Sequence, residues 1–376
     1  MQFSISKEIF LDGITKVQGI AGRKTTFPIT ANVLISAQGS TVTLVATDLE
    51  IGFKGHYPAT VEEEGTITIP GKKLFEIVRE FPYGIVNCRD MENGWVNIYK
   101  DKVQYKMVGM DPNDFPQLPE VEDMEFFDLD SSMFATMIEK TNLSGGMSSE
   151  EKRPHLIGVY LEKIVLEEKN GLRMVSTDGN RLARVDYVPE QDMPPPAFGG
   201  AKGVILPKKV MTEIIRVAEG DGQVRLGVQK NYFVVQKESE TIIGRLVEGE
   251  YPDYNLVIPS DLETFFEIEK QPFVSILKRM SILCSERYRA VRFRVNSERL
   301  EVSVNNPELG DSNEEMPISF NGEAFEAAFN PRFFLDALNP MRSDIIKVNI
   351  LNASKPCVLE GTEDPRYLSV IMPMRM

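Results

Sequence analysis

Two aspartates recur at matching places in the sequence, and recurring carboxylates are candidates for acid–base or metal chemistry. Asp48 and Asp178 each end a run of apolar alternation, and a third run of this kind ends at Asn305, Asn306 and Pro307. Asp and Asn that follow a strand commonly accept hydrogen bonds from the backbone of their own turn. We therefore interpret these residues as turn-stabilising. An enzyme that uses Asp48 or Asp178 is the alternative.

The other reactive side chains do not form a recognisable site. His56 and His155 lack a cysteine or an acidic pair at metal-ligand spacing. Cys88, Cys284 and Cys357 lie far apart, which argues against a disulfide framework and against a zinc site. The sequence has neither a glycine-rich phosphate loop nor a nucleophile elbow. It therefore predicts no cofactor, no metal and no catalytic residue.

Basic residues recur on or beside segments with helical spacing. They are Arg23, Lys24, Lys72, Lys73, Arg79, Lys140, Lys152, Arg153, Lys208, Lys209, Arg216, Lys278, Arg279, Arg287 and Arg289. One interpretation is ordinary solvated helix surface. The other is a basic lining that faces a phosphate backbone and does not read bases.

The end of the chain is unusually apolar. Val370 and Ile371 read as a last strand, either tucked into a core or exposed, and Pro373 then ends regular pairing. The methionines at 372, 374 and 376 are soft side chains that adapt to varied partners. We expect Met372 to Met376 to line an exposed groove in which partner peptides dock.

The elements that must position these residues recur three times. Hairpin patterns cover residues 31–48, 157–178 and 291–305, and the recurring turns are about 130 residues apart, the length of a domain. Each hairpin follows residues with helical spacing and precedes a strand, a proline and a second helical segment. These prolines are Pro70, Pro207 and Pro331. We expect three α+β domains of one type, with two helices and several antiparallel strands each, over residues 1–125, 126–253 and 254–376.

Composition restricts the class of protein. The net charge of −14 argues against a conventional nucleic-acid binder, which usually carries a basic footprint. It is compatible with basic residues gathered on an inner surface and an acidic exterior, which would hold DNA weakly. No apolar run is long enough to span a membrane, and the first residues lack a signal-peptide pattern, so we expect a cytoplasmic protein.

Five motifs, taken with their order and the repeat period, resemble the bacterial DNA polymerase III β subunit, the sliding clamp family. They are Ala46 to Leu49, Ser176 to Leu182, Glu248 to Tyr254, Asn305 to Pro307 and Val370 to Arg375. The resemblance covers the whole chain. It implies a non-catalytic, head-to-tail homodimer whose six domains form a ring with helices inside and a continuous sheet outside. The ring would encircle double-stranded DNA and confer processivity on the replicative polymerase.

The resemblance also implies site residues. A partner-peptide pocket between the second and third domains would bind the polymerase, the clamp loader and other replication and repair proteins. Its positions would be Leu156, Thr177, Gly179, Asn180, Arg181, Leu182, Pro252, Val257, Phe333, Pro356, Val370, Ile371, Met372, Pro373, Met374, Arg375 and Met376. The DNA contacts would be Arg23, Lys24, Lys72, Lys73, Arg153, Lys208 and Lys209. The dimer interface would include Tyr105, Ile282 and Leu283. A clamp-like ring of other stoichiometry is the nearest alternative, and three repeats per chain argue against it.

Overall fold

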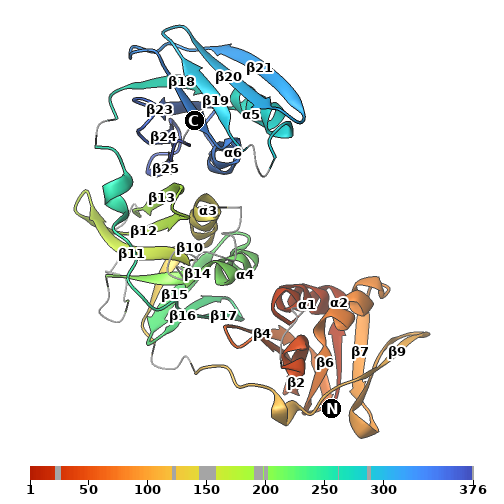
Figure 1. The fold of residues 1–376 in the computed structure, drawn as a ribbon. Coiled ribbons are helices and arrows are strands. Elements are labelled where there is room, and N and C mark those ends of the chain that lie inside the picture. The colour runs from red at the N-terminus through yellow and green to blue at the C-terminus, as the bar shows by residue number, and fades with distance from the viewer. Residues whose placement is uncertain are drawn as a thin grey trace. The chain divides into compact units, whose positions relative to one another are not determined.

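The computed structural model describes residues 1–21, 27–120, 124–143, 158–189, 198, 202–260, 262–285 and 289–374. Their elements follow one order three times (Figure 1). The first repeat contains β1 (Gln2–Ser6), α1 (Lys7–Ala21), β2 (Asn32–Gln38), β3 (Thr41–Thr47), β4 (Ile51–Pro58), β5 (Thr60–Glu63), β6 (Gly65–Pro70), α2 (Gly71–Glu80), β7 (Ile85–Asp90), β8 (Trp95–Lys100) and β9 (Val103–Val108).

In the described residues, the other two repeats have the same order without an equivalent of β5. The second contains β10 (Phe126–Asp130), α3 (Ser131–Thr141), β11 (Gly158–Leu166), β12 (Lys169–Thr177), β13 (Arg181–Tyr187), β14 (Gly203–Pro207), α4 (Lys208–Ala218), β15 (Gln223–Gln229), β16 (Tyr232–Lys237) and β17 (Glu240–Arg245). The third contains β18 (Phe265–Glu269), α5 (Lys270–Ile282), β19 (Val291–Val295), β20 (Arg299–Asn306), β21 (Gly310–Pro317), β22 (Phe325–Phe329), α6 (Pro331–Leu338), β23 (Ile345–Asn349), β24 (Cys357–Gly361) and β25 (Tyr367–Ile371). The predicted threefold repetition of one α+β unit is confirmed.

Antiparallel pairing continues the sheets from one repeat to the next. We call β4, β13 and β21 the receiving strands and β9, β17 and β25 the last strands of their repeats. The last strand β17 pairs with the receiving strand β4, and β25 pairs with β13. The two pairings build two eight-stranded sheets, with the orders β10-β15-β16-β17-β4-β3-β2-β6 and β14-β11-β12-β13-β25-β24-β23-β18. In the described part of the chain, β9 and β21 lie at the edges of a five-stranded and a four-stranded sheet.

The chain separates into two compact units. One comprises Met1–Ala135, Ala197–Ala201 and Leu206–Leu246, and the other comprises Thr136–Pro196, Lys202–Ile205 and Val247–Met376. The β17–β4 pairing lies within the first unit and the β13–β25 pairing within the second. The domain boundaries expected from the sequence stay a prediction.

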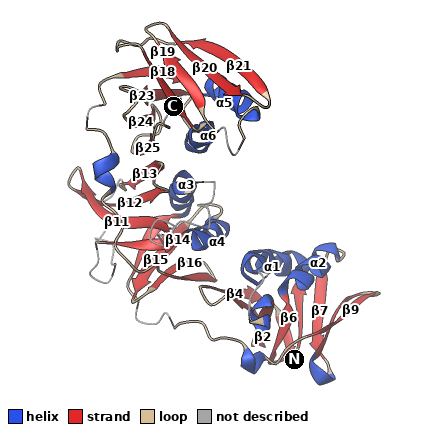
Figure 2. Ribbon diagram, in the orientation of Figure 1, coloured by secondary structure: helices blue, strands red, loops and turns tan. Residues whose placement is uncertain are grey.

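The helices form where apolar residues recur at helical spacing. In α1, Phe10, Ile14 and Val17 are fully buried, and α1 packs against α2, beside which it lies in Figure 2. The second helix of each repeat begins at or directly after Pro70, Pro207 or Pro331, as predicted. Proline suits this place because the first N–H groups of a helix have no intrahelical acceptor. None of the helices formed by the described residues is both long and apolar enough to cross a membrane.

Candidate functional site

The recurring Asp and Asn side chains hold the turn that follows a strand. The Asp178 Oδ1 atom accepts hydrogen bonds from the backbone N–H groups of Asn180 and Arg181, at 3.0 and 3.1 Å. Asp48 accepts two equivalent bonds at 3.1 and 2.9 Å, and Asn306 accepts one from Glu308 at 3.0 Å. The interpretation of these residues as turn-stabilising is confirmed.

Arg181, the first residue of β13, joins this turn to helix α6. Its side chain is 2% exposed, and it donates to Asp178 Oδ2 at 2.9 Å and to Asp336 Oδ2 at 2.6 Å. Its guanidinium also lies over the ring of Phe333, 4.3 Å from the ring centroid. A buried guanidinium needs such partners, because an unpaired charge in the interior is costly.

The last strand and the segment after it lie against the same turn. Val370 and Ile371 are buried within β25, so the core interpretation of these two residues is confirmed. Beyond the strand, the Met372 N–H donates to the Asn180 carbonyl at 2.9 Å, and the Met374 N–H donates to the Ala328 carbonyl at 2.7 Å. The backbone of the segment is thus held from both sides, and its side chains stay half-buried.

A buried polar network holds the segment that links the second and third repeats. The Tyr254 hydroxyl donates to Glu162, and Arg173 donates to that hydroxyl at 3.2 Å and to both carboxylate oxygens of Asp186. Burial, followed by the bond to Glu162, raises the pKa of Tyr254 to about 12. The Tyr254 ring packs in one apolar cluster with Leu182 and with residues of β24 and β25. The turn of residues 254–257 is therefore fixed beside the end of β25.

The predicted pocket residues come from segments that contact one another through Arg181 and Phe333, through Asn180 and Met372, and through Leu182 and Val370. We define the C-terminal surface as their half-buried or exposed members, which are Thr177, Gly179, Asn180, Pro252, Val257, Phe333, Pro356, Met372, Pro373 and Met374. Arg181, Leu182, Val370 and Ile371 lie beneath them, each at most 3% exposed. Leu156, Arg375 and Met376 lie outside the described residues.

The predicted DNA-contacting residues differ in their surroundings. Lys72 and Lys73 are exposed at the start of α2, where Lys73 pairs with Glu76 at 2.6 Å. Lys208 and Lys209 are half-buried on α4, and Lys209 pairs with Asp48 at 2.5 Å and with Glu50 at 3.0 Å. Arg23, Lys24 and Arg153 lie outside the described residues, as do Lys152 and Arg287.

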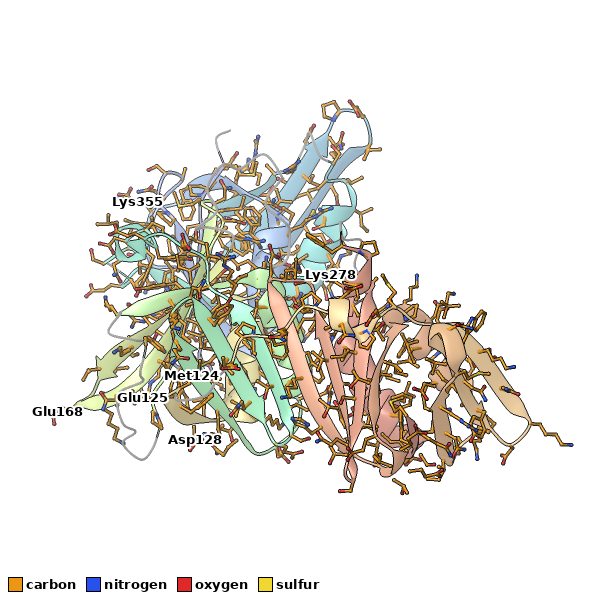
Figure 3. The ribbon with its side chains drawn as sticks, turned by 90° about the horizontal axis from the view of Figure 1, so that it is seen from below. Met124, Glu125, Asp128, Glu168, Lys278 and Lys355 are labelled. Atoms are coloured by element: carbon orange, nitrogen blue, oxygen red, sulfur yellow. The ribbon has the colours of Figure 1, made fainter. Side chains whose placement is uncertain are left out.

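The helices carry a moderate basic excess. The six described α-helices contain 13 Lys and Arg against seven Asp and Glu, whereas the rest of the chain contains 29 against 49. Figure 3 labels Lys278 on α5, Asp128 on β10 and Glu168 at the tip of the β11–β12 hairpin. Lys140 does not belong to an exposed basic surface as the sequence had suggested, because it is 8% exposed and paired with Asp364.

The predicted dimer residues lie beside the two edge strands. Tyr105 on β9 is 42% exposed and packs against Phe81. Ile282, at the end of α5, is 75% exposed, and Leu283 follows it and is half-buried.

Two partners in the site were not predicted. Asp336 and the Glu162–Arg173–Asp186 network lie far along the chain from the residues that they hold. For Asp336, the only sequence signal was its position three residues after Phe333 on one helix. Nothing in the sequence pointed to the second. In the described residues, no group of three or more His, Cys, Asp or Glu side chains could hold a metal ion.

Replacing Arg181 should loosen the site. Arg181→Met removes the cation that binds two half-buried carboxylates, so we expect the free energy of opening at the β13 and β25 amides to fall by about 1.5–3 kcal/mol. Native-state hydrogen exchange measures this energy. The control is Arg299→Met, which removes an exposed ion pair with Glu315 and should cost less than about 1 kcal/mol. Equal losses in the two variants would contradict the role given to Arg181.

Family models match the chain in three consecutive pieces. These describe the N-terminal, central and C-terminal domains of the DNA polymerase III beta subunit, and they match residues 1–119, 128–253 and 255–375. The chain is 30% identical to the beta sliding clamp of Chlamydia muridarum over 377 aligned positions, which cover 100% of this chain and 99% of that one. It is also 30% identical to the beta sliding clamp of Haemophilus influenzae over 382 residues, with full coverage of both.

Solved structures agree with these relatives. The DnaN sliding clamp of Bartonella birtlesii bound to griselimycin superposes with a TM-score of 0.91 at 29% identity, and the whole of both chains is covered. The DNA polymerase III subunit beta of Pseudomonas aeruginosa gives 0.87 at 27% identity, again over both whole chains. The chain therefore belongs to the bacterial DNA polymerase III β subunit family and is a sliding clamp.

Proposed function

We propose that two copies of this clamp join head to tail into a ring that encircles duplex DNA and tethers the replicative polymerase, without chemistry of its own. The repeats 1–125, 126–253 and 254–376 would be its domains, and it would act in the cytoplasm. The observation that carries the proposal is the pairing between consecutive repeats. Twice in one chain, a last strand completes the sheet of the preceding repeat, and one strand of each kind is left over.

The strands left over are β9, the last strand of the first repeat, and β21, the receiving strand of the third. An edge strand presents unpaired N–H and C=O groups, so it is a template for pairing with another chain. Because the two edges differ, their contact is head to tail, and such contacts close into a ring when the rotation permits. Two copies of three repeats give the six domains that the resemblance implies.

The repeats themselves supply a register for this seam. The hairpins before the last strands pair Lys100 with Val103 and Lys237 with Glu240, so Val103 corresponds to Glu240. On the receiving strands, the pairing within each hairpin likewise makes Glu314 of β21 correspond to Gly55 of β4. Gly55 lies opposite Glu240. Carrying this pairing to the seam places Val103 opposite Glu314 of a second copy. Three steps along, Lys106 lies opposite Asp311, a complementary pair of charges.

Tyr105, Ile282 and Leu283 support the same seam. Tyr105 lies between Val103 and Met107 on the face of β9 that packs against Phe81. Ile282 ends α5, the helix that also contacts β21 through Arg279 and Glu314. An exposed apolar residue at each of two complementary edges is what a seam between subunits needs at its centre.

The charge distribution suits a ring that slides. The basic excess on the helices is partly neutralised by neighbouring acids. The clamp would therefore neutralise few DNA phosphates and release few counterions, so its affinity for DNA would be low and salt-sensitive. We assign the DNA contacts to Lys72, Lys73, Lys208 and Lys209, together with Arg23, Lys24 and Arg153. The acidic remainder of the chain would repel DNA from the outside.

The C-terminal surface suits short peptides. It combines apolar Val257, Phe333 and the two methionines with backbone and amide groups of the Asp178 turn. A few polar groups around apolar anchors orient a bound segment and give it specificity. We assign this surface, with Leu156, Arg375 and Met376, to short peptides of the polymerase and the clamp loader that carry leucine and phenylalanine anchors.

A topological tether predicts unequal retention on DNA of different shape. On nicked circular DNA the clamp should stay bound many times longer than on the same DNA cut once, because a ring leaves a linear molecule by sliding off its end. Gel filtration of loaded complexes at physiological salt measures the difference. Equal retention on both substrates would contradict the ring.

Reversing one charge of the proposed seam should weaken the dimer. Lys106→Asp and Asp311→Lys each place like charges opposite each other, at about 1 kcal/mol per seam, and a ring has two seams. Sedimentation equilibrium should show a dissociation constant raised at least about tenfold for each variant. The double variant should recover, and the exposed control Lys230→Asp should change nothing. A double variant no tighter than the single ones would reject this register.

A charge on the C-terminal surface should abolish peptide binding. Met374→Glu puts a carboxylate among the apolar anchors, and we expect the affinity for a labelled Leu-Phe peptide to fall at least about tenfold. Fluorescence anisotropy measures it. The matched control is Val165→Glu, at an apolar residue that is 72% exposed on the β11–β12 hairpin. Unchanged binding by Met374→Glu would place the peptide elsewhere.

A further inference from the structure

The tenth residue of the first helix is a cation in all three repeats. These residues are Lys16, Lys140 and Arg279. The helices are in register, because each begins three residues before a fully buried phenylalanine. The phenylalanines are Phe10, Phe134 and Phe273. The three cations therefore occupy one structural position, and their partners can be compared directly.

Between the first and second repeats, this cation crosses the junction. The Lys16 Nζ atom lies 2.8 Å from Glu240, the first residue of β17, and 2.8 Å from Asp12 of its own helix. The Tyr57 hydroxyl on β4 donates to the same Glu240 oxygen at 2.8 Å. Glu240 is 7% exposed, so its charge depends on these two partners from the neighbouring repeat.

Between the second and third repeats, the equivalent cation also crosses. The Lys140 Nζ atom lies 2.5 Å from Asp364, just before β25, and 5.1 Å from the ring centroid of Tyr367. The other Asp364 oxygen accepts bonds from the Ser343 hydroxyl at 2.6 Å and from two backbone N–H groups. Burial opposes ionisation of Asp364, but the bonds from Lys140 and Ser343 outweigh it and lower its pKa.

In the third repeat, the cation stays within its own repeat. Arg279 makes two bonds to Glu314 of β21, at 2.7 and 2.5 Å, and the two side chains are 53% and 29% exposed. In a head-to-tail dimer, the first repeat of a second copy would receive the Arg279 side chain. Its residue corresponding to Glu240 is Val103, which carries no charge. A seam between β21 and β9 thus lacks the crossing cation, and it lacks an acceptor at the position of Glu240.

We propose that this helical position is a junction latch, engaged by Lys16–Glu240 and Lys140–Asp364 inside the chain and diverted by Arg279–Glu314 at the seam between copies. The seam part of the proposal depends on the head-to-tail dimer proposed above. A buried pair that loses one partner leaves an uncompensated charge, whereas an exposed pair contributes little. The latch therefore makes the two junctions within the chain harder to open than the seam.

The first experiment builds the missing latch. Glu314→Gln releases Arg279, and Val103→Glu in the same chain gives it an acceptor on the second copy. We expect this double variant to dissociate at least about tenfold more slowly than wild type when fluorescently labelled subunits exchange. The matched control combines Glu314→Gln with Val103→Gln, which has the same shape without the charge. Equal dissociation rates of the two double variants would contradict the proposal that Glu314 keeps Arg279 from crossing the seam.

The second experiment opens an existing latch and does not need the dimer. Lys140→Gln should speed hydrogen exchange of the β13 and β25 amides at least about tenfold, and Lys278→Gln, at an exposed lysine of α5, should leave it unchanged. If Lys140→Gln does not fold, Asp364→Asn answers the same question, because it keeps the acceptor for Ser343. Exchange within about twofold of wild type would overturn the latch.

The two experiments separate the two proposals. If wild type sediments as a monomer at every concentration, the proposed dimer fails, and hydrogen exchange alone decides the latch within the chain. If the dimer forms and the exchange is unchanged, the latch fails and the ring stands.

Discussion

Backbone pairing between the last strand of one repeat and the receiving strand of the preceding one organises this chain. At β17–β4 and β13–β25 it turns separate sheets into continuous ones, and it brings one first helix to each junction. The same pairing creates the site, because the β12–β13 turn meets the end of β25 only where the two strands are joined. The C-terminal surface, to which we assign partner peptides, is therefore a by-product of the way in which repeats are connected.

Periodicity predicted the repeated parts well. Apolar residues at helical spacing, alternation in the hairpins and proline at the second helix each depend on neighbours along the chain, and the structure has all three. The turn role of Asp178 also follows from local chemistry, because the backbone N–H groups that donate to its carboxylate lie within three residues of it. Membership of a sliding-clamp family could be recognised because these local signals recur in a fixed order.

Contacts between distant segments could not be predicted in this way. Lys140 has the sequence surroundings of an exposed helix cation, and only the neighbouring repeat turns it into a buried one. Arg181 and Asp336 are 155 positions apart in the chain, and Tyr254 and Glu162 are 92 positions apart. In each case a polar residue is buried by an element that local patterning cannot place. Charged residues at junctions are therefore the least predictable part of the site.

The fixed backbone of Met372 and Met374 bears on how the surface can change during evolution. The backbone N–H group of each residue donates to a carbonyl of another segment, so substitutions alter the side chains without moving the segment. The residues beneath them are core residues of β25 and β13, and Arg181 of β13 is bound to two carboxylates. A drug that contacts backbone atoms and the buried layer would leave few mutations that confer resistance without also weakening the fold.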